Sequence, residues 1–182
     1  MDHRALVLQR HRHLKWRALD PVEAVLMVLC GVSIGGFTAS VLADVVTRTI
    51  GHPWLWLQQV TTGFFAYGAF IGMAAATRRL DHLFLSEITR RAMGPTRAVL
   101  ETFNRLVVLA VAIIMAWFGY KNFLLDLGSF RMPSMIPLGT YTAIVPLVGI
   151  LIALFAIEQL VNGLRHGFEG PEDAVGVREP VE

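Results

Sequence analysis

Four long stretches of apolar residues, separated by shorter polar segments, set the pattern of this chain. They cover residues 22–43, 55–77, 103–125 and 138–163. An α-helix rises about 1.5 Å per residue, so about 20 apolar residues cross the roughly 30 Å hydrocarbon core of a bilayer. The pattern therefore predicts an all-α integral membrane protein with four transmembrane helices.

The second stretch carries markers of both membrane boundaries. Trp54 and Trp56 come just before it, and an indole ring suits the half-hydrated headgroup layer. Arg78 and Arg79 follow it, and arginine is retained on the cytoplasmic side of a membrane. We therefore expect these four side chains to contact lipid headgroups.

Residues 79–94 form neither a span nor an ordinary loop. Apolar residues fall on one broad arc of a helix, and polar residues fall mainly on the other. This pattern predicts an amphipathic arm helix along the inner interface, with Arg90 and Arg91 directed toward lipid phosphates. A simple cytoplasmic linker helix is the alternative.

The distribution of charge predicts the orientation. Only 16% of the residues are charged, against about 25% in a soluble domain. If both termini and the arm are cytoplasmic, thirteen of the sixteen Lys and Arg residues lie inside, as the positive-inside rule requires. Residues 1–20 are then a basic cytoplasmic tail, 21–165 the membrane domain and 166–182 a disordered cytoplasmic tail. Because the arginines flank apolar runs, no nucleic-acid partner is expected.

Small residues recur every four positions in the first two spans. Such residues let helix backbones approach closely in lipid, where hydrophobic attraction between helices is weak. We expect the two spans to pack as a hairpin through these faces, or to use them for a partner. The outer part of the second span adds two neighbouring glutamines that can hydrogen-bond to a neighbouring helix or to a partner chain. The candidate contact residues are Gly31, Gly35, Ala39, Gly68, Gly72, Ala76, Gln58 and Gln59.

Three further features predict local structure. Asp20 and Pro21 suit the start of the first helix, with the aspartate capping free amides. Residues 44–53 read as a short outer loop, and Pro146 should kink the fourth span. Glu158 and Arg105 lie at similar depth, so they can pair across helices or reach the headgroups separately.

The spans carry few groups for chemistry. No charged residue lies within about two turns of any span centre, which disfavours a proton relay. All six histidines lie outside the apolar stretches, so axial haem ligands are missing. No spacing indicates a nucleophile with its base and orienting acid. We therefore expect no enzyme, cofactor or metal site, but a structural or accessory subunit.

Several segments together resemble the small membrane subunit of TRAP (tripartite ATP-independent periplasmic) transporters, the DctQ-like family. They are DVVTR at 44–48, the stretch 54–60, RRLDH at 78–82, and MPSMIPL at 132–138 followed by Tyr141 and Pro146. The resemblance covers about residues 20–165. The family commonly has an acidic residue where this chain has Gln58 and Gln59, so no role of a carboxylate is carried over.

The resemblance implies a scaffold or anchor subunit of a sodium-coupled importer of a carboxylate-type solute in a bacterial or archaeal inner membrane. Its implied partners are a large membrane subunit, which binds solute and sodium, a transient periplasmic substrate-binding protein, and membrane lipids. The alternative is an anchor or assembly subunit of another complex, such as a quinone-linked oxidoreductase. A self-assembling exporter is a third reading, disfavoured by the missing mid-membrane acid.

Overall fold

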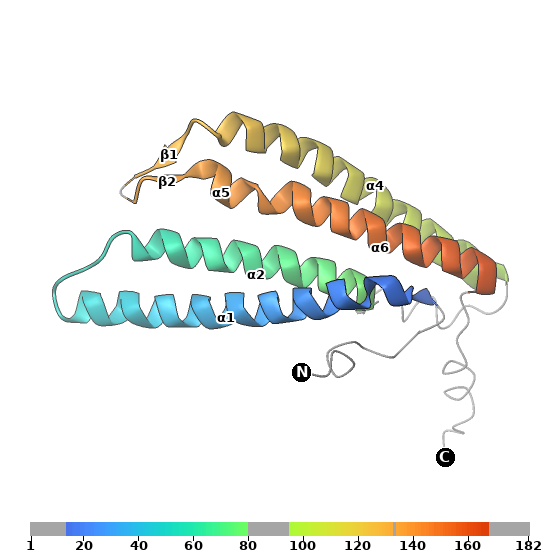
Figure 1. The fold of residues 1–182 in the computed structure, drawn as a ribbon, viewed down its shortest axis with the longest axis horizontal. Helices are drawn as coiled ribbons and strands as arrows, with labels where there is room; N and C mark the ends of the chain where they lie inside the picture. Colours follow the sequence, from blue (N-terminus) through green and yellow to red (C-terminus); the bar gives the residue numbers. More distant parts are fainter. Residues whose placement is uncertain (1–13, 80–94, 133, 168–182) are drawn as a thin grey trace, which may run out of the picture.

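The computed structural model describes residues 14–79, 95–132 and 134–167. The predicted arm, with Arg90 and Arg91, and most of both predicted tails lie outside these ranges. Within the described residues, four helical spans are long and apolar enough to cross a membrane: Arg17–Thr49, Leu57–Arg79, Ala98–Asp126 and Leu138–Arg165. The fold is therefore that of an all-α membrane protein (Figure 1).

The elements follow one another in a simple order (Figure 1). A short 3₁₀-helix, η3 (Arg17–Leu19), leads into α1 (Asp20–Thr49) and α2 (Leu57–Arg79). After the arm region come α4 (Pro95–Asp126), the strands β1 (Phe130–Arg131) and β2 (Ile136–Pro137), and finally α5 (Leu138–Thr142) and α6 (Ile144–His166). The strands pair antiparallel, with Phe130 opposite Pro137 and Arg131 opposite Ile136.

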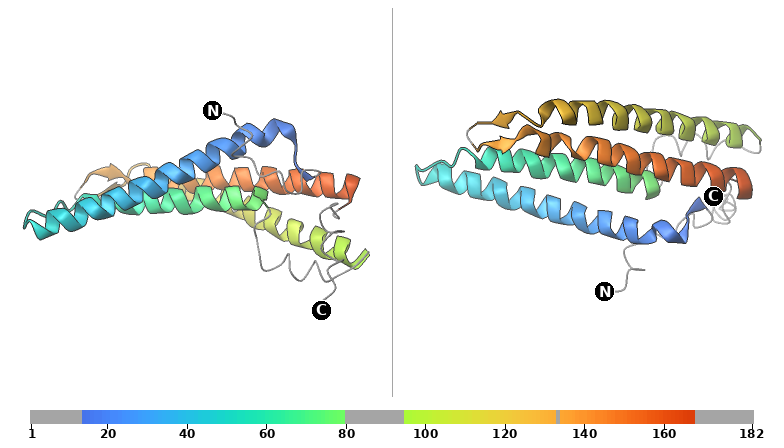
Figure 2. Two further views of the ribbon diagram at one scale, coloured as in Figure 1. Left: turned by 90° about the horizontal axis from the view of Figure 1, so that it is seen from below. Right: turned by 45° about the horizontal axis from the view of Figure 1, so that its top comes forward.

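The four long helices lie side by side in the order α1, α2, α6, α4 (Figures 1 and 2). α1 packs extensively on α2, and α4 packs extensively on α6, so the chain forms two helical hairpins. The two hairpins meet mainly where α2 contacts α6. α1 and α4 therefore lie at the two edges of the row.

The core follows the contact between the hairpins. Its buried apolar side chains come from α1, α2, α4 and α6, with α5 leading directly into it. Gly149 on α6 shows how closely α4 approaches, because a Cβ there would lie 2.6 Å from the backbone nitrogen of Ala116. The core residues are Leu26, Ile71, Ala74, Ala75, Ala112, Ile144, Val148, Ile152 and Phe155.

The first helix is longer than the sequence pattern predicted. Residues 44–49, expected to belong to an outer loop, continue α1, and the chain turns at Gly51 with a φ of +80°. Asp44 and Arg48 lie one turn apart and pair at 2.9 Å, which supports the helical conformation. The predicted cap is also wrong: the helix begins at Asp20, and the capping position, Leu19, makes no side-chain hydrogen bond.

The last span is interrupted near its N-terminal end. α5 ends at Thr142, and α6 begins at Ile144. Pro146 has no N–H to donate to the carbonyl group of Thr142, so the helical ladder is broken there. The break separates a five-residue turn of helix, with Tyr141, from the long helix α6, which contributes Ile144, Val148, Ile152 and Phe155 to the core.

Candidate functional site

Polar side chains gather at both ends of the contact between α2 and α6. At one end, which we call the ionic joint, Asp20, Glu23, Arg78 and Glu158 come together from three helices. At the other end, which we call the amide joint, the side chain of Gln59 binds the segment between β1 and β2, and Tyr141 binds its backbone. Between them the contact is apolar. These two joints are the candidate functional site.

Arg78 is the centre of the ionic joint. Its side chain is fully buried, and its nitrogens lie 3.0 Å from Asp20, 3.5 Å from Glu23 and 3.5 Å from Glu158. Its guanidinium carbon lies 5.4 Å from the centre of the Phe155 ring, which adds a cation–π contact. A buried charge is tolerated only when it is paired and hydrogen-bonded, and Arg78 is both.

Two more cations surround Glu23, which is itself fully buried. Arg79 lies 3.3 Å from one carboxylate oxygen of Glu23, and Lys15 lies 3.9 Å from the other. Burial lowers the pKa of Lys15 below its ordinary value, and the neighbouring Glu23 opposes this shift. The joint therefore holds three cations, Lys15, Arg78 and Arg79, against three carboxylates.

Arg105 and Glu158 do not form the cross-helix pair considered from the sequence. Glu158 pairs with Arg78 instead. Arg105 pairs with Glu101 one turn earlier on α4, at 2.9 Å, and donates a hydrogen bond to Gln159 at 3.4 Å. Gln159 in turn donates to the backbone oxygen of Thr77 at 2.8 Å. Polar bonds thus continue from α4 through α6 to the end of α2.

The amide joint uses both halves of the Gln59 side chain. Its nitrogen donates to the backbone oxygen of Met132, and its oxygen accepts from the hydroxyl of Ser134 and from its backbone N–H, the latter at 3.3 Å. The hydroxyl of Tyr141 donates to the backbone oxygen of Gln59 at 3.1 Å. Because an ionised carboxylate accepts but does not donate, it could not replace this amide at Met132.

The two glutamines of the predicted polar pair therefore have different surroundings. Gln59 is buried and joins the hairpins, whereas Gln58 is exposed on the neighbouring position. Tyr67, two turns further along α2, donates from its hydroxyl to the backbone oxygen of Thr140 at 2.6 Å. The α5 turn is thus held against α2 at more than one point.

The small residues of α2 and α1 have different surroundings. A Cβ on Gly68 would lie 3.2 Å from that of Ser33, and one on Gly72 would lie 3.6 Å from the sulfur of Cys30, so both face α1. Ala76, half-buried, continues their spacing. On α1, a Cβ at Gly31 or Gly35 would meet nothing within 4 Å.

The expected seam on α1 is therefore wrong as a contact within the hairpin. Gly31, Gly35 and Ala39 are exposed, and the face against α2 carries Ser33 and Gly36 instead. A Cβ at Gly36 would lie 2.6 Å from the ring of Phe64. Positions 35 and 36 are 100° apart on a helix, so a repeat of four alone does not decide which face is used.

The four side chains expected to contact lipid headgroups also differ in their exposure. Trp54 and Trp56 are about half exposed, and their rings stack with centres 5.8 Å apart at the start of α2. Arg78 cannot contact headgroups, because the ionic joint buries it completely. Arg79 retains 21% of its side-chain exposure while pairing with Glu23.

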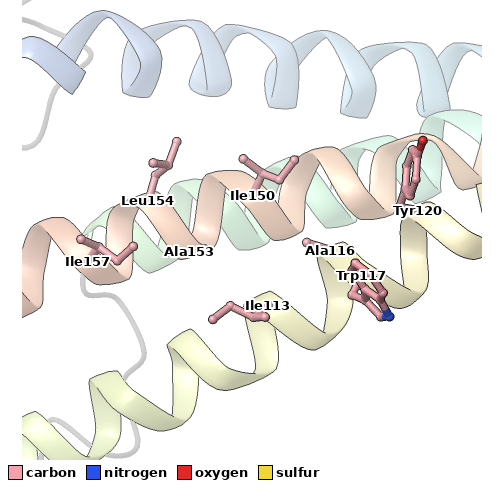
Figure 3. A pocket seen from close by; sticks show the side chains of 8 residues that line it. All are labelled: Ile113, Ala116, Trp117, Tyr120, Ile150, Ala153, Leu154 and Ile157. Atoms are coloured by element: carbon pink, nitrogen blue, oxygen red, sulfur yellow. The ribbon is translucent and has the colours of Figure 1, made fainter.

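An apolar groove of about 390 Å³ runs between α4 and α6 (Figure 3). Its lining is almost entirely carbon, so it offers no set of hydrogen-bond donors for a polar solute. Within the described residues, no three His, Cys, Asp or Glu side chains are grouped to hold a metal ion. The groove is lined by Ile113, Ala116, Trp117, Tyr120, Ile150, Ala153, Leu154 and Ile157.

Sequence reasoning missed several residues of the two joints. Asn162, whose side chain binds Leu14 and Trp16 next to the ionic joint, lies four positions after Glu158, so the sequence already indicated one polar face of α6. The contact of Trp16 could not be predicted in this way, because a single aromatic residue in a basic tail belongs to no periodic pattern. Ser134 and Tyr141 lie in or next to a loop, where side-chain partners depend on the tertiary fold.

Comparisons with known proteins assign the chain to a family. Residues 37–166 match the family described as "Tripartite ATP-independent periplasmic transporters, DctQ component". The chain therefore belongs to the DctQ family and is a component of a TRAP transporter. This is a transport family of multi-pass membrane proteins.

One curated relative gives a more specific likeness. The chain is 25% identical, over 83 residues, to the sialic acid TRAP transporter permease protein SiaT of Haemophilus influenzae (strain 86-028NP). The alignment covers 45% of this chain and only 14% of that protein. The aligned part of the chain thus corresponds to a small part of a much longer permease.

Proposed function

We propose that this chain is the scaffold and anchor subunit of a binding-protein-dependent TRAP importer. The observation that carries the proposal is the placement of its charges. Those buried in the described spans, together with Lys15, lie near one end of the helix row, and each has an ionic or hydrogen-bonding partner. An arrangement of this kind stabilises helix packing, whereas an ion pathway requires polar groups at mid-membrane.

The single row of helices supports the same role. α1 and α4 are edge helices with long apolar faces, which can pack on another membrane protein or on lipid. The partner we propose is the large TRAP membrane subunit, which would carry the sites for solute and sodium. A periplasmic binding protein would deliver a carboxylate-type solute to the complex in a bacterial or archaeal inner membrane.

Reconstitution tests this assignment. Proteoliposomes would contain this chain alone, the large subunit alone, or both, with binding protein and a sodium gradient supplied. We expect solute uptake only when both membrane subunits are present, with stoichiometric co-purification in mild detergent. Uptake by this chain alone, or co-purification with a redox subunit instead, would overturn the proposal.

The arm expected over residues 79–94 remains part of the proposal. It would lie on the inner membrane surface and resist tilting of the complex, with Arg90 and Arg91 near lipid phosphates. Reversing both charges should weaken binding to anionic lipid and reduce uptake in anionic liposomes but not in neutral ones. Equal uptake by the variant and the wild type in anionic liposomes would exclude this role.

A further inference from the structure

Residues 14–19 connect two helices that are not neighbours in the row. The segment precedes α1, an edge helix, yet it binds α6, which lies on the other side of α2. It therefore crosses the end of α2 at the ionic joint. The match to the DctQ family begins only at residue 37, so this crossing lies outside the matched region.

Asn162 on α6 provides the receiving site. This side chain is almost completely buried, and its amide binds the segment through both of its halves. The nitrogen donates to the backbone oxygen of Leu14 at 3.1 Å, and the oxygen accepts from the indole nitrogen of Trp16 at 2.8 Å. Leu14 itself is buried beside this contact, with 1% of its surface exposed.

The ionic joint holds the same segment from both helices that it joins. Glu158 on α6 accepts from the backbone N–H of Trp16. Arg78 on α2 donates to the backbone oxygen of Trp16 at 3.0 Å and to that of Leu19. The segment is thus bound by α2 and by α6 at once.

Such directional bonds matter because the inter-hairpin contact between the two joints is apolar. In a bilayer, lipid chains compete equally well for apolar side chains, so apolar contact alone fixes an angle between helices poorly. We propose that residues 14–19 are a latch that fixes the angle between the α1–α2 and α4–α6 hairpins at the ionic joint. The latch would set the shape of the helix row independently of any transport partner.

Spin-label distances in the full chain in nanodiscs test the latch. Cys30→Ser gives the background, and labels are placed on exposed positions of α1 and α6. The pair Val25→Cys and Leu164→Cys reports on the latch end, and the pair Leu42→Cys and Leu147→Cys reports on the far end. Each pair is measured with and without Asn162→Leu, which removes both hydrogen bonds to the segment.

We expect Asn162→Leu to lengthen and broaden the distance distribution of the latch-end pair while the far-end pair stays unchanged. Trp16→Phe, which removes only the indole donor, should give a smaller change in the same direction. Asn122→Leu is the matched control, because Asn122 is exposed on α4. Unchanged latch-end distances in both test variants, or equal changes at both ends, would overturn the proposal.

Discussion

The two joints connect the same pair of helices by different chemistry. The ionic joint brings three carboxylates and three cations together, with Arg78 completely buried among them. The amide joint uses one neutral side chain, Gln59, whose hydrogen bonds run to a short loop and a tyrosine. Both lie beside the same apolar contact of α2 with α6.

The two joints should differ in the groups that are left without a partner when one side chain is removed. Deleting a buried charge leaves its former partners charged and desolvated, which costs far more than the bond itself contributes. Deleting a neutral amide leaves hydrogen-bonding groups that can turn toward water or headgroups at the membrane surface. The ionic joint should therefore respond to substitution sharply, and the amide joint more gradually.

The largest effect is expected for Arg78→Met. It leaves Asp20, Glu23 and Glu158 close together with fewer cations, and it should lower the free energy of unfolding by about 3–5 kcal/mol. Unfolding in mixed detergent micelles titrated with SDS measures this change. Arg79→Met is the matched control, with an expected cost of about 1 kcal/mol or less for a partly exposed pair. Equal losses in the two variants would show that Arg78 has no central role.

A moderate effect is expected for Gln59→Leu at the amide joint. The variant leaves the Met132 oxygen and Ser134 without this partner and should cost about 1–3 kcal/mol in the same unfolding measurement. Gln59→Glu should not restore stability, because a carboxylate does not donate to Met132. The adjacent Gln58→Leu, on the exposed face, should stay within about 0.5 kcal/mol of the wild type. A loss at position 58 as large as that at 59 would contradict the assignment.

A third comparison separates contacts within a hairpin from the joints between hairpins. Gly36→Ala places a Cβ against the ring of Phe64 and should cost near the lower end of the roughly 1–3 kcal/mol typical of overpacking, since the ring can turn. Gly35→Ala enters open space and should leave the isolated chain unaffected. Thermal unfolding in detergent measures both. A larger loss at Gly35 would return the hairpin seam to the face first expected from the sequence.

The smallest effect concerns pH. Because burial lowers the pKa of Lys15 in the folded chain, the unfolded chain binds more protons at alkaline pH. Stability should therefore rise as the pH increases from the lowered pKa toward the ordinary value of 10.5. Lys15→Met should remove this contribution, which the difference between the two pH–stability profiles measures. A profile unchanged by the substitution would show that Lys15 is solvated.

The sequence predicted the helices well and their partners only partly. Span number follows from hydropathy, because lipid forces a long apolar run into a helix. The helical state of residues 44–49 was missed because their polar side chains interrupt the run of high hydropathy, whereas the helix continues through them. The fate of Arg78 could not be derived, since an arginine beside a span has the same local sequence whether it contacts phosphate or a buried carboxylate from residue 158. Gln59 was recognised as a contact residue, but its loop partners depend on the break before Pro146.

The position of Arg78 also has a consequence for how the protein is made. On the predicted orientation, Arg78 and Arg79 hold the end of α2 on the cytoplasmic side when the first hairpin leaves the ribosome. At that stage Asp20 and Glu23 have already been synthesised, but Glu158 has not. On that orientation, the same guanidinium would act twice, first as a topology signal during membrane insertion and then, once α6 has been made, as the buried cation at the centre of the ionic joint.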